Sequence, residues 1–235
     1  MTMPCAPVLA LILAASGLAL ASAPAVAAEE AAERFPLPEG CAAFVTVQYK
    51  LCTVSHYYTC AGDPEGYQHR VDLDDEGPFF VSTIDAETQW IESRDLRAGI
   101  LDRLRDGARD PASFTELTRT GRDDFDFTTG SDAGEIIRYR GTDSLTGETV
   151  IIDDVPLLRT ETFARATRED GSLVYESRGN EYVHLDWRLF LGGQSVTRTP
   201  ERTYQDDDAP VTFHFPGEAG FLAWEPAFNC DALLL

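Results

Sequence analysis

The chain has 235 residues, of which 43% are hydrophobic, so it is long enough to bury a substantial core. Its formal net charge at pH 7 is -21, from 40 acidic and 19 basic residues. Because such a surface repels phosphate backbones and anionic lipid headgroups, the charge argues against nucleic-acid and membrane-surface binding. Cationic partners, divalent metals and simple solubility are all compatible with it.

The chain begins with an apolar stretch over residues 6–20, followed by the small-x-small sequence Ala25-Val26-Ala27. This stretch is shorter than the roughly 20 residues that a membrane-spanning helix needs, and the pattern is typical of a signal peptide. We expect cleavage after Ala27, no transmembrane segment, and a periplasmic or secreted mature protein; an alanine-rich leader is the alternative. The expected organisation is a signal peptide over 1–27, a short polar lead-in over 28–40 and one β-rich domain over 41–235.

Four cysteines remain after the leader, at Cys41, Cys52, Cys60 and Cys230. In an oxidising compartment they predict two disulfides. A thiolate metal site is disfavoured because no C-x-x-C pair occurs.

Two disulfide pairings fit the spacing. Strands over 41–48 and 53–60, closed by a loop over 49–52, would place Cys41 opposite Cys60 and leave Cys52 for Cys230. A bend near Ser55 or His56 would instead join Cys52 to Cys60 and leave Cys41 for Cys230. Both pairings predict that Cys230 bonds back to the first hairpin.

The next segments read as strands over 66–73, 77–84 and 88–93. Between the first two, residues 72–77 loosely match the first half of a calcium-binding EF-hand loop, but the twelfth position is Thr83 where a glutamate is needed. A charged hairpin turn is the better interpretation. The other short acidic loops are weaker candidates still.

The pattern then changes to a helical one. Leu96, Ile100, Leu101 and Leu104 recur at helical spacing and predict a helix over 94–106. Asp110-Pro111 resembles a helix start, so a second short helix is expected from there through Leu117, ending at Gly121.

From Phe125 onward the chain returns to strands, including 134–141 and 147–155 with a loop over 142–146. Asp170-Gly171, Gly179-Asn180 and Gly192-Gly193 are three potential hairpin turns, which predict a four-stranded antiparallel meander over 157–199. A last strand is expected over 211–215.

Counting from these turns assigns side chains to the two faces of the meander. Arg165 is then opposite Glu176, as an ion pair near the edge of the apolar face. We expect that apolar face to be the core face: Phe163, Val174, Val183, Leu185, Trp187, Leu189 and Val196. The other face carries mostly polar residues: Thr162, Ala164, Ala166, Tyr175, Ser177, Tyr182, His184, Asp186, Arg188, Thr197 and Thr199.

The polar face supplies the candidate ligand-binding residues, with His184 expected opposite Tyr175 and near Asp186. A histidine beside a carboxylate can act as a general base, and an arginine can hold an anionic group. Polar residues are also ordinary on a solvated sheet face, and no motif supplies a nucleophile. We therefore predict no catalytic residue and no metal or cofactor. The predicted ligand contacts are Tyr175, Tyr182, His184, Asp186 and Arg188.

The predicted fold is mainly β (α+β): roughly eleven antiparallel strands in a strongly curved sheet or open barrel, with two short helices inserted near 94–120. A two-sheet sandwich is the alternative. The leader predicts an exported protein, periplasmic or secreted. The predicted function is that of a non-catalytic protein that binds an apolar or amphiphilic ligand, or an envelope protein partner, in the curve of the sheet. Two alternatives are a hydrolase using His184 and Asp186, and an acidic, envelope-associated structural protein that binds divalent cations.

Overall fold

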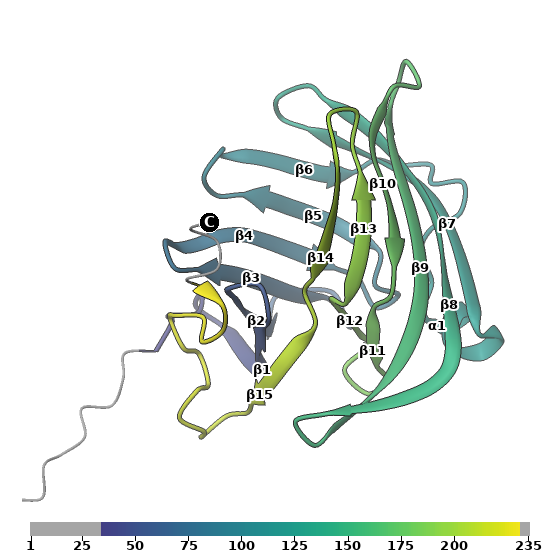
Figure 1. The fold of residues 1–235 in the computed structure, drawn as a ribbon. Helices are drawn as coiled ribbons and strands as arrows, with labels where there is room; N and C mark the ends of the chain where they lie inside the picture. Colours follow the sequence, from purple (N-terminus) through teal and green to yellow (C-terminus); the bar gives the residue numbers. More distant parts are fainter. Residues whose placement is uncertain (1–33, 231–235) are drawn as a thin grey trace, which may run out of the picture. The chain divides into compact units, whose positions relative to one another are not determined.

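The computed structural model describes residues 34–230, which form one antiparallel sheet and one short helix (Figure 1). The expected leader lies outside the described residues. Within residues 34–230 no helix is long and apolar enough to cross a membrane.

The secondary-structure elements follow one another closely along the chain. They are β1 (Cys41–Tyr49), β2 (Thr53–Cys60), β3 (Gln68–Asp74), β4 (Gly77–Ile84), β5 (Trp90–Asp95), β6 (Ile100–Leu104), α1 (Phe114–Thr120), β7 (Arg122–Ser131), β8 (Ile136–Ile152), β9 (Val155–Arg168), β10 (Leu173–Gly179), β11 (Tyr182–His184), β12 (Leu189–Leu191), β13 (Gln194–Arg198), β14 (Thr203–Asp207) and β15 (Pro210–His214).

The sheet has 15 strands and curls strongly without closing. Strands β1 to β10 are neighbours in chain order, β13 and β14 follow β10, and β15 pairs with β1 at the other end. Only Asp208 and Ala209 separate β14 from β15 in the chain, so the two ends of the strand order are held close together. Figure 1 shows β7–β10, β13 and β14 at a steep angle to β3–β6. The predicted mainly β, strongly curved open sheet is confirmed, and the sandwich alternative is wrong.

The predicted helix over 94–106 is wrong. The chain there forms the end of β5, a turn and β6. The Asp95 carboxylate accepts hydrogen bonds from the backbone N–H groups of Arg97 and Ala98, at 2.9 and 2.8 Å, and Gly99 has a φ of +71°. These are turn features that interrupt a helix, and they outweigh the apolar spacing.

The second predicted helix exists but is shorter at its start. Ser113 is the N-cap of α1, with its hydroxyl accepting from the backbone N–H of Glu116, and Gly121 is the C-cap at a φ of 84°. Asp110, the expected cap, instead forms an isolated bridge with Asp126. The predicted end of the helix at Gly121 is confirmed.

The meander is only partly as predicted. The turn at Asp170-Gly171 joins β9 and β10, and Arg165 faces Glu176 with Nη1 2.9 Å from Oε2. Beyond it, β10 pairs with β13, while residues 180–193 leave the meander and form β11 and β12, with β11 pairing against β9. Residues 142–146, predicted as a loop, lie inside β8, and β14 was not predicted.

Two glycines explain why residues 180–193 do not form the predicted hairpins. A Cβ on Gly179 would clash with the carbonyl oxygen of Gln194, and one on Gly193 would clash with the carbonyl oxygen of Asn180. These glycines therefore let the two ends of the 180–193 segment pass each other at close range, rather than form separate turns.

The predicted faces of the meander are consequently wrong. Phe163, expected in the core, lies outside under the Arg178 guanidinium, 4.2 Å from its ring centroid. Leu185 and Val196 are 47% and 43% exposed. Only Val183 and Leu189 of that set are fully buried. The face of β9 and β10 expected to be polar and solvated, which includes Ala166 at 0% exposure, instead turns to the concave side of the sheet.

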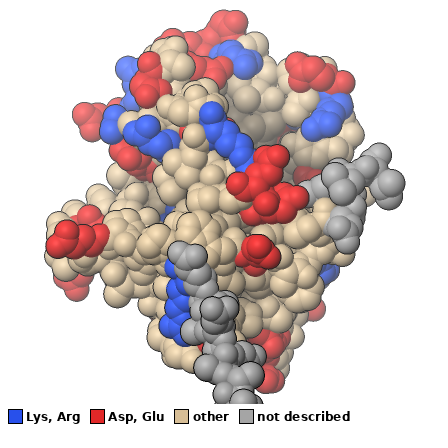
Figure 2. Space-filling view, turned by 90° about the vertical axis from the view of Figure 1, so that its left-hand side faces the viewer, with Lys and Arg blue, Asp and Glu red and all other residues tan. Residues whose placement is uncertain are grey.

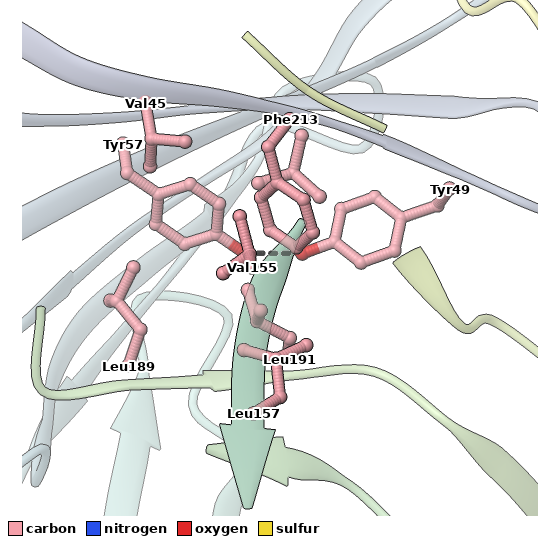
Figure 3. Close-up of a cluster of buried hydrophobic side chains, with 9 residues drawn as sticks. Val45, Tyr49, Tyr57, Val155, Leu157, Leu189, Leu191 and Phe213 are labelled. Atoms are coloured by element: carbon pink, nitrogen blue, oxygen red, sulfur yellow. Dashed lines mark hydrogen bonds between the residues drawn. The ribbon is translucent and has the colours of Figure 1, made fainter. Parts of the chain in front are cut away.

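The main core is built by side chains from β1, β2, β9, β12 and β15 that pack against one another (Figure 3). The Tyr49 and Tyr57 hydroxyls are hydrogen bonded to each other there, 2.7 Å apart. Two smaller clusters lie elsewhere: Phe35 and Trp224 cover the outer face of β2 and β3, and α1 packs against Val183. The main core consists of Val45, Val47, Tyr49, Tyr57, Val155, Leu157, Leu189, Leu191 and Phe213.

The first of the two disulfide pairings is confirmed: Cys41 is bonded to Cys60 and Cys52 to Cys230. The hairpin register differs by one residue, because Tyr49 rather than Gln48 is opposite Thr53. A bulge between Ala43 and Val45 restores the expected alignment at the cysteines. Between the bulge and the turn, Val45 therefore faces Tyr57 and Val47 faces Ser55.

Candidate functional site

Above the main core, many of the side chains that line the concave side of the sheet are half-buried rather than sealed. Register places them on one face of β4–β10, which we call the upper inner face. It carries both aromatic and acidic groups. Among its half-buried members are Ser82, Ser93, Asp102, Phe125, Tyr139, Tyr175 and Ser177.

Five aromatic residues form an aromatic wall on this face: Trp90, Phe125, Phe127, Tyr139 and Tyr175. The Trp90 ring on β5 lies 5.1 Å from Tyr139 on β8, although two strands separate them. Strands lie about 4.8 Å apart, so rings three strands away meet only where the sheet curves inward. Phe127 stacks on Tyr139 at 5.3 Å, and Tyr175 continues the row at 6.4 Å. Trp90 is nevertheless 48% exposed, so solvent reaches the wall.

Three carboxyl groups, Asp123, Asp143 and Glu181, form an acidic cluster beside the wall. Asp123 and Asp143 are directly opposite each other on β7 and β8, and Asp123 is only 5% exposed. Burial raises the pKa of Asp143 to about 8, with Glu181 and Asp123 adding like charge. Burial also raises the pKa of Glu181 to about 7, against the influence of Arg70, and that of Asp123 to about 6. The cluster therefore holds protons at neutral pH that ordinary carboxyl groups release.

Arg70 on β3 is the basic group whose charge acts on Glu181 of this cluster. Its Nε lies 3.1 Å from Oδ1 of Asp72, which also accepts a 2.6 Å hydrogen bond from the Ser55 hydroxyl. Burial opposes its charge, but Asp72 and the neighbouring tyrosines raise the Arg70 pKa above its ordinary value. Asp208 lies nearby with a buried Oδ1 that has no partner among the described residues, and burial raises its pKa to about 7.

Of the predicted ligand contacts, only Tyr175 belongs to the aromatic wall. Tyr182 and His184 lie on β11, and His184 pairs with Leu189, not with Tyr175 as expected. The His184 Nδ1 accepts a 3.2 Å hydrogen bond from the Trp187 backbone N–H, and its ring stacks on Trp187 at 3.5 Å. Burial lowers its pKa. Asp186 is exposed, and no hydrogen bond between described residues joins it to His184.

Arg188 ties three parts of the chain together. Its Nε donates to the Ala86 carbonyl oxygen at 2.7 Å, and its Nη2 donates to Glu87 Oε1 at 3.1 Å. Its guanidinium also lies 4.5 Å from the Phe114 ring centroid on α1. With these donors in use, Arg188 has a structural role between the β4–β5 loop, α1 and the β11–β12 turn.

Replacing Arg188 by alanine is expected to lower the free energy of unfolding by about 1–2 kcal/mol, because charge-assisted hydrogen bonds are lost. Urea denaturation would measure it. The matched control is Arg178→Ala, whose guanidinium lies 4.2 Å from the Phe163 ring centroid but is 66% exposed. We expect about 0.5 kcal/mol or less there. Equal losses in the two variants would contradict the structural role.

The predicted charged hairpin turn at residues 72–77 is confirmed, with Asp74 opposite Gly77. In the described part of the chain, one group of three potential metal-ligating side chains comes together, Cys60, Asp63 and His69. The Cys60 sulfur is bonded to Cys41, so it offers no thiolate. That group therefore does not form a metal site.

The outer face carries an open groove of about 1190 Å³ over β8, β9, β10, β13 and β14. Some of its charged groups have partners: Arg159 Nη1 lies 3.4 Å from Glu148 Oε2, and Asp207 binds Lys50 at 2.8 Å. Figure 2, which views the molecule from the left-hand side of Figure 1, shows acidic and basic side chains interspersed over the upper part of that face. One aromatic residue, Phe163, lines this groove, whereas the upper inner face carries five.

Sequence reasoning missed the acidic cluster, although a signal was present. Asp123 is in the same alternation as Phe125 and Phe127, and Asp143 is in the same alternation as Tyr139. Period-2 counting thus places these two acids on the aromatic face. Glu181 had no such signal, because its position depends on where the 180–193 segment leaves the meander.

Comparison of the chain with protein-family models, with curated proteins and with solved structures finds no match. The site is therefore interpreted from its own chemistry.

Proposed function

We propose that the protein is a non-catalytic binding protein that takes up an amphiphilic ligand on the upper inner face of its curved sheet. The observation that supports this most is the aromatic wall, which is open to solvent at Trp90 and lies on a concave surface directly beside an acidic cluster. Binding sites for small molecules are concave and lined by apolar and aromatic groups with a few polar ones.

Covering the aromatic wall with an apolar ligand would be favourable in free energy. Burying apolar area contributes about 25 cal/mol per Å². Trp90 keeps 48% of its surface exposed while its ring touches two other aromatic rings. An apolar chain lying along Trp90, Tyr139 and Tyr175 would gain this free energy without any rearrangement of the sheet.

The hydrolase alternative has less support. His184 uses its Nδ1 to accept from Trp187, and Arg188 is occupied by Ala86 and Glu87. The alternative of a cation-binding structural protein rests on net charge alone. Two disulfides are compatible with an exported protein, and we include export, by way of the expected signal peptide, in the proposal.

Titration with dodecyl maltoside below its micelle concentration tests the proposal. We expect saturable binding by calorimetry and a change in tryptophan fluorescence. Trp90→Ala should weaken binding by about tenfold or more, since a large apolar contact is lost. The matched control is Trp224→Ala, on the outer face against Phe35, where affinity should be unchanged.

Native mass spectrometry of the purified protein provides a second measurement, because a retained small molecule would support the proposal directly. No binding of dodecyl maltoside, together with no retained molecule, would overturn it. Equal weakening by Trp90→Ala and Trp224→Ala would also overturn the proposed location.

A further inference from the structure

The carboxylates of Asp143 and Glu181 accept no hydrogen bond from any described residue, although both side chains lie in the curve of the sheet. Asp123, at 5% exposure, uses one oxygen, Oδ2, to accept from the Ser113 backbone N–H at 2.9 Å. Its other oxygen has no partner in the described part of the chain. None of these unused oxygens is among the fully buried, unpartnered side-chain atoms of the described residues, so a ligand that enters the curve of the sheet can reach them and donate hydrogen bonds to them.

The charges on this side of the sheet do not balance. Arg70 is the basic side chain that influences Glu181, and it is already engaged with Asp72 at 3.1 Å. Three carboxyl groups, those of Asp72, Glu181 and Asp208, interact with this one guanidinium. The raised pKa values of Asp143 and Asp123 have burial and neighbouring acids among their causes and no basic side chain.

We infer that the amphiphilic ligand carries a protonated amine as its head group, which donates hydrogen bonds to Asp143 and Glu181 while its apolar chain lies along the aromatic wall. This inference rests on the proposed function and specifies its ligand class. An ammonium group supplies both hydrogen-bond donors for these free oxygens and a positive charge for the acidic cluster.

The position of the wall relative to the acids supports one ligand reaching both. Tyr175, the end of the aromatic row, is close enough to Glu181 that the carboxylate contributes to raising the tyrosine pKa. From Tyr175 the row continues through Tyr139 to Trp90, with ring centroids 6.4 and 5.1 Å apart. A chain that starts at Glu181 can therefore follow the rings towards exposed Trp90.

A metal ion fits this cluster less well than an amine. Calcium requires six to eight oxygen ligands at roughly 2.3–2.6 Å. Among the described residues, the acids of this cluster do not bring three ligand atoms within 4.8 Å of one another, since Cys60, Asp63 and His69 are the group that does. An ammonium needs only two or three acceptors and tolerates a wider arrangement.

Proton release gives a signature of the head group. In the ligand-free protein, Asp143 and Glu181 have pKa values of about 8 and 7, and they share a site with Asp123, Arg70 and Tyr175. An ammonium favours the ionised carboxylates, so binding at pH 7 should release about one proton. The amine should accordingly bind more tightly at pH 8 than at pH 6.

The test compares dodecylammonium, dodecyl maltoside and dodecanoate by calorimetry, each below its micelle concentration. We expect dodecylammonium to bind at least tenfold more tightly than dodecyl maltoside, and dodecanoate to bind most weakly. Repeating the dodecylammonium titration in buffers of different ionisation enthalpy measures the protons released, and this requires no variant.

A matched pair of substitutions locates the head group. Glu181→Gln should weaken dodecylammonium binding by about tenfold or more and leave dodecyl maltoside unchanged. Glu161→Gln removes the same charge from an exposed position on β9 and should change neither. If Glu181→Gln does not fold, Asp143→Asn takes its place.

The outcomes separate the two proposals. If dodecyl maltoside binds as tightly as dodecylammonium, the amine head group is overturned while the binding function stands. If no amphiphile binds, both are overturned. Equal weakening by Glu161→Gln, or no proton release, would attribute amine binding to general surface charge and overturn the inference. Calcium binding that is lost in Glu181→Gln would assign the acids to a metal instead.

Discussion

Replacing Cys52 and Cys230 by serine is expected to lower the free energy of unfolding by about 3–5 kcal/mol. This disulfide joins residues 178 positions apart, so it removes more chain entropy from the unfolded state than a short-range bridge does. It also fixes the C-terminal segment to the first hairpin, where the Cys52 N–H donates to Phe228 O at 3.1 Å and Asn229 Nδ2 donates to Lys50 O at 2.9 Å. Urea denaturation of the double variant measures the loss.

The matched control is the Cys41–Cys60 disulfide, which joins residues 19 positions apart at the end of β1 and β2. Its double serine variant is expected to lose about 3 kcal/mol or less in the same chain-entropy treatment. Under reduction, the wild-type protein should lose more stability than either variant. A loss for Cys52–Cys230 no larger than that for Cys41–Cys60 would contradict the long-range role.

The disulfide framework and the curved sheet could be predicted because both depend on local patterns. Cysteine spacing and alternation over 41–60 placed Cys41 opposite Cys60, and a one-residue error in the loop was cancelled by the bulge between Ala43 and Val45. The helix predicted over 94–106 failed for the converse reason. Four leucine and isoleucine residues had helical spacing, but Asp95 and Gly99 form a turn. Apolar spacing alone carries no information about turn residues.

The inside and outside of the meander could not be predicted from hydrophobicity. Phe163 and Val196 were expected inside because they are apolar, yet Phe163 is covered by Arg178 on the outer face. The inner face of β9 and β10 carries Ser177 and Thr162, which the pattern assigned to solvent. A half-buried inner face does not require apolar residues at every position, so polarity alone does not reveal which side is concave.

The candidate site, too, could be predicted only in part. Tyr175 was predicted as a ligand contact and lies on the aromatic wall. His184 and Arg188 belong to the 180–193 segment, which leaves the meander, and they do not line the wall. The close approach of Gly193 to Asn180 determines that departure. It involves residues from two separate strands, so no local pattern encodes it.

The ligand-free protein is expected to gain stability when Asp143 is replaced by asparagine, and the gain should grow as the pH rises from 5 to 8. The folded pKa of Asp143, about 8, lies above the ordinary aspartate value because of burial and the neighbouring Glu181 and Asp123. A carboxyl group with a raised folded pKa binds its proton more tightly when folded, so it opposes folding increasingly as the pH rises towards that pKa. Asparagine removes this penalty, by on the order of 1–3 kcal/mol at pH 8.

The difference between variant and wild type is the quantity to measure, because other groups also titrate. Burial lowers the pKa of His56 to about 4, which reduces wild-type stability as the pH falls through 6.5 towards 4 and affects both proteins equally. The control is Asp124→Asn, next to the cluster but exposed, where Arg122 lowers the aspartate pKa. Its stability difference should be flat between pH 5 and 8, since Asp124 is ionised in both states over that range. Thermal unfolding of each variant and the wild type at pH 5, 6, 7 and 8 tests this. If the stability difference between Asp143→Asn and wild type were the same at all four pH values, Asp143 would not retain its proton in the folded protein.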